Sequence, residues 1–293
     1  FTYALEVLNA DLLFEMDADF SHDPKVLPEF VKKIDAGADF VIGSRYKKGG
    51  SIPADWGLHR KIFSIGGNLI IRLGFMKLRV SDWTSGYRAI KSWVVKSSFS
   101  YIQNSTGYVF QVALLENALK LHAQVEEIPI NFVDRKYGVS KLDSSQYIKN
   151  TLWYVFTHSS FVKYVIVGGS GFVIDFGLSY LFIEKIHSNF PVWLAVVLSA
   201  EVAIIWNFIW NNYWTFSHKK VAHKLTDFLK SLVKFNGVAL GSIFIQASLI
   251  ELCVRLFGRS NWYIYKILII GFIIIPYSYV LYNRVVWRGS RKV

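Results

Sequence analysis

The sequence predicts an α/β domain followed by an all-α transmembrane domain of four helices. Short apolar runs alternate with helical patterns up to about residue 160, and long apolar segments follow. Of the 293 residues, 53% are hydrophobic and only 18% are charged, so we expect part of the chain to face lipid. We expect the α/β domain at residues 1–145, an interfacial helix or linker at 146–160 and the transmembrane domain at 161–293.

The α/β domain is predicted from four elements. Residues 12–14 form a short apolar run typical of a buried strand, and residues 24–34 carry apolar side chains at helical spacing. Residues 39–43 are the next predicted strand. A further strand is predicted at 125–133, where Pro129 indicates a sheet edge or a strand start. This alternation predicts a sheet with helices on its faces.

Four apolar segments in the second half are each long enough to span a hydrocarbon core. They cover residues 161–183, 193–216, 232–257 and 263–287. Basic residues gather in one connection and at the C-terminus: Lys219, Lys220, Lys224, Lys230, Arg288, Arg291 and Lys292. The positive-inside rule therefore predicts a multi-pass protein with both termini in the cytoplasm, and the even number of spans puts the α/β domain there too.

The membrane half repeats itself weakly. Lys163-Tyr164 recurs as Lys234-Phe235, and Asn212 recurs as Asn283. Phe208 and Tyr279 keep the same register. The pattern predicts two similar helical hairpins related as parallel repeats.

Two acids, Asp175 and Glu201, lie within the predicted spans. Intramembrane acids are costly and face a partner or a wet cavity. An interhelical hydrogen bond or Lys266 is the expected partner in a structural role, and a role in handling lipid is the alternative.

The formal net charge of +12 agrees with basic cytoplasmic loops. Attraction of an anionic lipid or nucleotide is a compatible second cause. The chain lacks a basic, aromatic-interleaved recognition element, so we expect the partners to include the lipid bilayer and no nucleic acid. Cys253 is the only cysteine, which excludes an intrachain disulfide.

Asp17 and Asp19 follow the first predicted strand. If the strand continues through them, both carboxylates project to the same side and face one ion. Mg²⁺ and Mn²⁺ prefer oxygen ligands and leave positions open for substrate phosphates. Ser21 supplies a weaker oxygen or orients a ligand water; alternatively, Ser21 or Asp23 caps the helix that follows. The predicted metal ligands are therefore Asp17, Asp19 and Ser21, for Mg²⁺ or Mn²⁺.

Cations elsewhere in this half are candidates for binding phosphate, because Arg makes bidentate phosphate contacts and Lys provides a compact charge. They are Arg45, Arg60, Arg135 and Lys141. Arg60 and Ser64 are four residues apart and so share one face of a helix. The alternative for each cation is a solvated surface charge.

The segment 60–76 mixes apolar and basic residues in the way of an interfacial amphipathic helix. A buried core helix is the alternative. Residues 147–156 have a similar pattern and are expected on the membrane surface.

Several motifs occur in an order that resembles family 2 glycosyltransferases of the Rossmann-like GT-A fold, and among these the dolichol-phosphate mannose synthases. The chain is identified as a member on residues 16–22 (MDADFSH), 43–46 (GSRY), 58–64 (LHRKIFS), 82–88 (DWTSGYR), 107–111 (GYVFQ) and 134–142 (DRKYGVSKL). Residues 161–293 resemble the GtrA-like four-helix membrane domain found in some of these synthases.

The resemblance implies a metal-dependent, inverting transfer of mannose from GDP-mannose to dolichyl or another polyprenyl phosphate. It implies catalytic roles for Asp17, Asp19 and Arg45, and acceptor-phosphate contacts from Arg60 and Ser64. The implied donor-binding residues are Asp17, Ala18, Asp19, Arg45, Arg135 and Lys141.

Two alternatives remain open: the same enzyme class using a UDP-sugar such as UDP-glucose, and a lipid-phosphate carrier or flippase with a regulatory α/β domain. Residues 1–5 resemble the end of a helix already under way, so we expect the family's N-terminal strand and nucleotide-binding loop to be missing from the chain as given. Ser21 is typical of the mannosyl branch and favours mannose.

Overall fold

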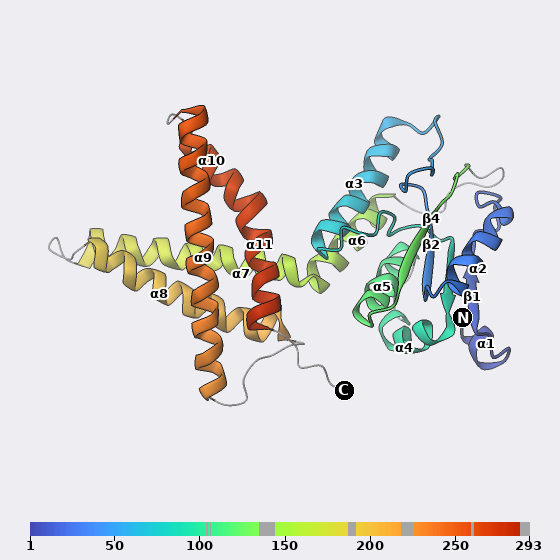
Figure 1. Cartoon of the computed structure of the whole chain (residues 1–293), viewed down its shortest axis with the longest axis horizontal. Coiled ribbons are helices and arrows are strands. Elements are labelled where there is room, and N and C mark those ends of the chain that lie inside the picture. The colour runs from blue at the N-terminus through green and yellow to red at the C-terminus, as the bar shows by residue number, and fades with distance from the viewer. Residues whose placement is uncertain are drawn as a thin grey trace. The chain divides into compact units, whose positions relative to one another are not determined.

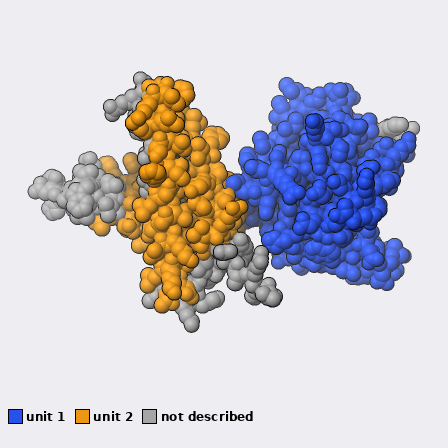
Figure 2. All heavy atoms as spheres, in the orientation of Figure 1, with its two compact units in different colours: residues 1–159 blue, residues 160–293 orange. Residues whose placement is uncertain are grey.

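The computed structural model describes residues 1–103, 105, 107–134, 144–186, 192–217, 225–258 and 261–287. The chain divides into two compact units, Phe1–Ser159 and Ser160–Val293, coloured blue and orange in Figure 2.

The first unit alternates strands and helices along the chain (Figure 1). Its elements are α1 (Thr2–Glu6), β1 (Leu12–Glu15), η1 (Pro24–Val26), α2 (Leu27–Asp35), β2 (Phe40–Ser44), α3 (Leu58–Gly74), β3 (Arg88–Lys91), α4 (Ser92–Ile102), α5 (Gly107–Lys120), β4 (Val125–Pro129) and α6 (Ser144–His158). The α/β fold predicted from the sequence is confirmed, including the helix at the start of the chain.

The described strands form one mixed sheet in the order β1-β3-β2-β4. β2 and β4 are parallel, whereas β3 runs antiparallel to both β1 and β2. β4 lies at one edge of this sheet, one of the two positions that Pro129 indicated. It ends at Pro129, so the predicted strand over 125–133 was too long. Because β3 is reversed, it begins at the same edge of the sheet where β1, β2 and β4 end. That edge collects polar loops from all four strands.

Helices cover both faces of the sheet, since every residue of the central strand β2 is buried. On one face, Phe30 of α2 packs in a core cluster with Val41, Tyr87, Ala89 and Ile128. In Figure 1, α2 lies on one side of the strands and α5 on the other.

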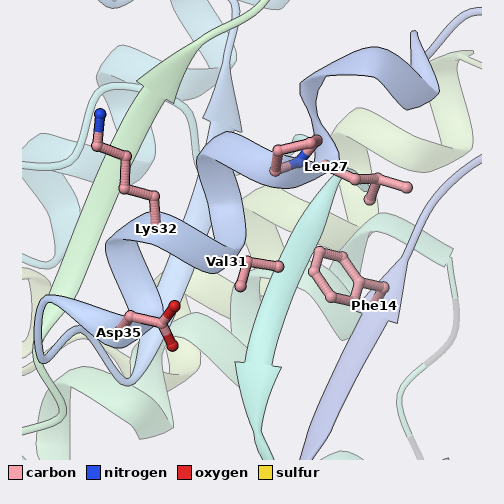
Figure 3. Close-up of a pocket in the computed structure, with 6 residues that line it drawn as sticks. Phe14, Leu27, Val31, Lys32 and Asp35 are labelled. Carbon is pink, nitrogen blue, oxygen red and sulfur yellow. The ribbon is translucent and has the colours of Figure 1, made fainter.

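A shallow apolar depression lies between α2 and β1 (Figure 3). Phe14, Leu27, Pro28 and Val31 form its apolar walls, and Lys32 and Asp35 complete its lining. None of these residues belongs to the polar loops at the strand ends.

α3 and α6 pack closely where α3 ends. A Cβ on Gly74 would lie 2.4 Å from Cγ1 of the buried Val155, and the Ser159 hydroxyl donates to the Gly74 carbonyl. Tyr154 on the same helix donates to Glu116 of α5 at 2.8 Å. These contacts attach α6 to the α/β domain.

α3 has many exposed apolar side chains in addition to its buried contacts: Leu58, Ile62, Phe63, Ile65, Leu69, Ile70 and Leu73. Trp153 and Phe156 of α6 are exposed as well. The proposal that both helices lie on a membrane surface remains a prediction that agrees with this exposure.

The second unit is helical. Its elements are α7 (Ser160–Tyr180), η2 (Leu181–Ile186), α8 (Val192–Trp210), η3 (Asn211–Thr215), α9 (Leu225–Phe257), α10 (Trp262–Ile269), η5 (Ile270–Ile274), α11 (Ile275–Leu281) and η6 (Tyr282–Val286). In the described part of the chain, 2 helices are long and apolar enough to cross a membrane, Ser160–Leu178 and Thr226–Phe257, and Ile270–Val286 is a shorter apolar helix. All four predicted segments are helical, but only these two meet that test of length and composition.

The internal repeat of the sequence recurs in the structure. Both hairpins end in a π-helical turn, η3 and η6, at equivalent positions. The residue after each turn donates its N–H to the first residue of the turn, Phe216 to Asn211 and Trp287 to Tyr282. The Phe216 and Trp287 rings stack with centroids 4.5 Å apart.

The aromatic core of the second unit repeats in pairs around this stack. Phe208 and Phe235 have ring centroids 5.6 Å apart, and the equivalent rings, Tyr279 and Tyr164, are also 5.6 Å apart. The two hairpins therefore contribute equivalent aromatic side chains to one core. Whether they are parallel repeats in a membrane stays a prediction.

The two acids of this unit differ in their surroundings. Asp175 has a buried Oδ1 with no hydrogen-bond partner in the described residues, and Glu201 is exposed. The side chain of Lys266 lies outside the described residues.

We predict that Gly74→Ala destabilises the α/β unit by about 1–3 kcal/mol, because the new methyl group overlaps the stiff, buried Val155. Gly66→Ala on the same helix is the matched control. Its Cβ meets nothing within 4 Å, so it stabilises α3 by about 0.5–1 kcal/mol. Thermal unfolding of both variants gives the comparison, and an unchanged or raised Tm for Gly74→Ala would contradict the packing described for α3 and α6.

Candidate active site

Polar side chains from four loops meet at the edge of the sheet where β1, β2 and β4 end and β3 begins. β1 leads into a turn that carries Asp17 and Asp19, and β2 leads into Arg45. Asp82 lies in the loop before β3, and Asp134 follows β4. The reversed direction of β3 brings Asp82 to this edge.

The acidic turn is held by its own hydrogen bonds. Asp19 Oδ1 accepts from the Ser21 N–H at 3.1 Å and from the Ser21 hydroxyl at 2.5 Å. Phe20 between them has a φ of 66°, a left-handed conformation that bends the chain tightly. The structure corrects one expectation here, because β1 ends at Glu15 and does not continue through the acids. The orientation of the Asp17 and Asp19 side chains is therefore determined by the turn and not by the alternation of a strand.

His22 is a buried side chain that contacts this turn and the core. It is 5% exposed, and its ring stacks on Tyr87 with centroids 4.7 Å apart. The Asp17 N–H donates to His22 Nδ1 at 3.1 Å, so this nitrogen carries no proton. Burial lowers the pKa of His22 even though the nearby Asp17 charge opposes that shift, and the ring is neutral.

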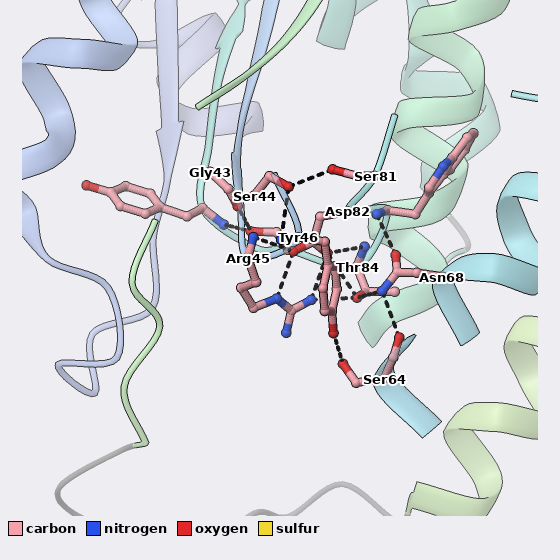
Figure 4. A network of polar contacts seen from close by, with 12 residues as sticks. Gly43, Ser44, Arg45, Tyr46, Ser64, Asn68, Ser81, Asp82 and Thr84 are labelled. Atoms are coloured by element: carbon pink, nitrogen blue, oxygen red, sulfur yellow. Dashed lines mark hydrogen bonds and ion pairs between the residues drawn. The ribbon is translucent and has the colours of Figure 1, made fainter. Parts of the chain in front are cut away.

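Arg45 and Asp82 form a buried ion pair, shown in Figure 4. Arg45 donates its backbone N–H and its Nε to Asp82 Oδ2 at 3.0 and 2.8 Å, and its Nη2 to Oδ1 at 2.7 Å. Burial acts to raise the pKa of Asp82, but the charge and hydrogen bonds of Arg45 outweigh burial and hold that pKa below its usual value. Asp82 is therefore a buried carboxylate that fixes the end of β2.

The loop around Asp82 is anchored from β4. The Glu127 carboxylate accepts from the N–H groups of Ser81 and Asp82, both at 3.0 Å, and from the Ser81 hydroxyl. The Ser85 hydroxyl donates to the Gly43 carbonyl at 2.6 Å. These bonds attach the loop to both strands of the parallel pair.

Arg88 anchors the end of the same loop. It is fully buried and donates to the carbonyls of Trp83, Ser85 and Gln111 at 2.9, 2.7 and 2.8 Å. Burial lowers the pKa of Arg88 to about 10, so the guanidinium stays charged at neutral pH.

α3 is joined to this loop by Asn68. Asn68 is 3% exposed; its Oδ1 accepts from the Trp83 N–H at 2.7 Å, and its Nδ2 donates to the Ser64 carbonyl at 2.9 Å and the Thr84 hydroxyl at 3.3 Å. Thr84 also accepts from Arg45 at 2.8 Å. The Tyr46 hydroxyl reaches the Ser64 hydroxyl at 2.5 Å. Ser64 and Arg45 therefore belong to one polar network.

Arg60 lies at the start of α3 and pairs with Asp134 through two hydrogen bonds of 2.9 and 3.1 Å. Its guanidinium lies 3.8 Å from the centre of the Trp56 ring, and the Trp56 Nε1 also donates to Asp134. The Arg60 side chain remains 47% exposed. The partly exposed Arg60 guanidinium therefore binds a carboxylate of the same chain.

Phe132, after β4, lies at the centre of these groups. Its ring is 5.7 Å from the His22 ring, 5.6 Å from the Arg45 guanidinium and 5.9 Å from the Trp56 ring. The acidic turn, the end of β2 and the start of α3 thus meet around one aromatic side chain.

The structure places most of the predicted site residues on the acidic turn, at the end of β2 or at the start of α3, which are linked through Phe132 and Tyr46: Asp17, Ala18, Asp19, Ser21, Arg45, Arg60 and Ser64. Arg135 and Lys141 lie outside the described residues. Sequence reasoning missed Asp82, Asn68 and Tyr46 as site residues. The sequence did contain an indication of Asn68, because it is a polar residue one helical turn after Ser64 in an otherwise apolar stretch.

The two carboxylates of the acidic turn are oxygen donors of the kind that Mg²⁺ and Mn²⁺ prefer, and a divalent cation there stays a prediction. The Asp17 side chain is 59% exposed, and Asp19 is held in place by Ser21. In the described residues there is no cluster of three His, Cys, Asp or Glu side chains suited to a metal. A site with two carboxylates leaves positions for substrate phosphate oxygens. Ser21 is buried and donates to Asp19; its direct ligation of a metal stays a prediction.

Two families match this chain. Residues 1–98 match the family described as glycosyl transferase family 2, and residues 163–287 match the GtrA/DPMS transmembrane domain. With the apolar helices of the second unit, the second match identifies a membrane protein.

Two curated relatives are similar to the chain. A dolichol-phosphate mannosyltransferase of Pyrococcus furiosus is 30% identical over 245 residues, which cover 81% of this chain and 66% of the relative. A polyprenol monophosphomannose synthase of Mycolicibacterium smegmatis is 39% identical over 134 residues, 46% of this chain and 50% of the relative. The chain thus spans between half and two thirds of the length of these relatives.

We predict that Asp82→Asn destabilises the α/β unit by about 3–5 kcal/mol at neutral pH, because it removes the carboxylate charge that offsets the largely buried Arg45 guanidinium. The pKa of Asp82 is lowered on folding, so its contribution is complete above pH 3.8 and is lost as the pH falls through the folded pKa. The difference between variant and wild type should therefore shrink in acid.

Unfolding measured against pH checks this prediction. Arg79→Gln is the control, because Arg79 is 85% exposed in its pair with Glu126 and should change stability by less than about 0.5 kcal/mol. Equal stability losses for the two variants at neutral pH would contradict the structural role of Asp82.

Proposed function

We propose that this chain, a glycosyl transferase family 2 domain joined to a GtrA/DPMS transmembrane domain, transfers mannose from GDP-mannose to a polyprenyl phosphate such as dolichyl phosphate. One observation supports the proposal: the acidic turn, the arginine held by Asp82 and the start of α3 lie around one side chain, Phe132, at one edge of the sheet. The names of both relatives support mannose as the sugar and a polyprenyl phosphate as the acceptor.

The proposed transfer does not require a side chain of the protein as general base. A phosphomonoester has a second pKa of about 6, so the lipid phosphate is ionised near neutral pH and is itself the nucleophile. Its oxygen attacks the anomeric carbon while the bond to the nucleotide diphosphate breaks. A single displacement in line would invert the configuration. The site then has to position two anions and offset their charge.

Asp17 and Asp19 are the residues that would hold Mg²⁺ or Mn²⁺. The cation, when bound, would stabilise negative charge that develops on the leaving diphosphate. Ser21 keeps the Asp19 carboxylate in one orientation, and His22 fixes the backbone of Asp17. Holding the Asp19 carboxylate and the Asp17 backbone before substrate arrives reduces the cost of organising the site.

Arg45, with Arg135 and Lys141, is proposed for the donor, and Arg60 with Ser64 for the lipid phosphate. Arg60 and Ser64 lie one turn apart on α3, whose exposed apolar residues suit a membrane surface. If the active site lies on the cytoplasmic side next to the bilayer, the phosphate group of the lipid could reach α3 while the lipid chain stays in the membrane.

We predict that Asp19→Asn lowers mannosyl transfer by about 100-fold or more, because the carboxylate charge at the metal is lost while the side-chain volume is kept. Asp23→Asn is the matched control in the same turn. Asp23 accepts from the Lys25 N–H as a helix cap, and Asn caps equally well. Transfer is measured over a range of Mg²⁺ or Mn²⁺ concentration after chelation, and near-normal activity of Asp19→Asn, or full activity in chelator, would refute the metal assignment.

A donor panel tests the sugar. GDP-mannose, UDP-glucose and UDP-N-acetylglucosamine are compared with dolichyl phosphate as acceptor, and GDP-mannose is expected to give the highest kcat/KM. A higher kcat/KM for a UDP-sugar would show that the donor is not GDP-mannose and would support the alternative of another hexosyltransferase. Movement of lipid phosphate across vesicles without any sugar transfer would instead support the carrier alternative.

A further inference from the structure

Tyr46 is the first residue after Arg45, and its hydroxyl lies 2.5 Å from that of Ser64. This contact joins the end of β2 to α3 (Figure 4). Asn68 holds the Ser64 carbonyl from the other side, so the turn of α3 that carries Ser64 is fixed at two points.

The number of hydrogens in this contact limits what Ser64 can do. Each hydroxyl has one hydrogen to donate and two lone pairs that accept. An ionised phosphate only accepts. If Ser64 donates to Tyr46, it has no hydrogen left for a phosphate, and if Tyr46 donates to Ser64, the Ser64 hydrogen stays available.

We propose that Tyr46 is a positioning residue, whose hydroxyl donates to Ser64 and so orients the Ser64 hydrogen toward the phosphate of the lipid acceptor. The inference rests on the proposed function, since it assumes that Ser64 faces this phosphate. It adds a residue to the acceptor site and places it next to Arg45 in the chain.

The surroundings of Tyr46 suit a donor. Burial raises the pKa of the Tyr46 phenol, and although the nearby Arg45 charge opposes that shift, the group keeps its proton at neutral pH. The Arg45 guanidinium lies 5.4 Å from the centre of the Tyr46 ring, and Arg45 itself is held by Asp82. The donor-side ion pair therefore fixes the ring whose hydroxyl serves the acceptor side.

The test compares Tyr46→Phe, Ser64→Ala and the double variant in full-length protein. Ser64→Ala loses a hydrogen bond to a charged group and should raise the KM for polyprenyl phosphate about tenfold. Tyr46→Phe removes only the hydroxyl and should raise the same KM about three- to tenfold. The KM for GDP-mannose and kcat should change little, and the double variant should equal Ser64→Ala, because Tyr46 acts through Ser64.

Tyr87→Phe is the matched control. It also loses one phenolic hydrogen bond, to the Asp23 carbonyl at 3.0 Å, in the core of the same unit. It should leave the KM for the acceptor unchanged, and Tm values of all variants monitor folding. The proposal is overturned if Tyr46→Phe leaves the acceptor KM unchanged, or if the effects of Tyr46→Phe and Ser64→Ala multiply.

A binding measurement separates this inference from the proposed function. Equilibrium binding of a short-chain polyprenyl phosphate is measured for wild type and variants without any donor. If the wild type transfers no sugar, the proposed function fails. The role of Tyr46 would still be supported if Tyr46→Phe binds the polyprenyl phosphate more weakly than wild type, while the double variant binds it as well as Ser64→Ala does. Equal binding by wild type and Tyr46→Phe would overturn it.

Discussion

The buried ion pair of Arg45 and Asp82 is the interaction on which the site depends. A carboxylate with no exposed surface is costly unless its charge and its lone pairs are matched, and Arg45 supplies both. Because the backbone N–H of Arg45 also donates to Asp82, the pair fixes the main chain at the end of β2 as well as the side chain. Glu127 holds the Asp82 loop against β4. These charged groups thus connect the ends of β2 and β4 at the edge where we propose that the substrates bind.

The direction of β3 explains why these groups meet. A parallel strand in the position of β3 would start at the opposite edge of the sheet and carry the Asp82 loop away from Arg45. The antiparallel strand places it directly against the end of β2, and Asn68 then extends the same network to α3. One connected set of hydrogen bonds runs from Arg45 through Thr84 and Asn68 to the turn that carries Ser64. The residues proposed for the donor and those proposed for the acceptor are therefore positioned by the same network.

Local patterns in the sequence predicted the α/β alternation, the helix of Arg60 and Ser64, and the aromatic register of the two hairpins. Each of these depends on neighbours in the chain or on a simple repeat. β3 was not predicted, because its four residues begin and end with charged side chains and show no apolar run. Three carbonyls accept hydrogen bonds from the buried Arg88, two in the loop directly before it and one, that of Gln111, on α5. The orientation of Asp17 and Asp19 was also not predictable, since β1 ends early and a left-handed Phe20 directs the turn.

The sequence by itself determined which chemistry is present: two acids after an apolar strand, several cations for phosphates, and a long apolar half that suits lipid. These are properties of residue type and spacing. Only the tertiary structure decided that Arg45 is bound by Asp82, that Arg60 holds Asp134, and that the Tyr46 hydroxyl meets Ser64. The physical reason is that a charged group or hydroxyl pairs with whichever partner the fold brings within about 3 Å, and in these three cases that partner comes from a distant part of the chain.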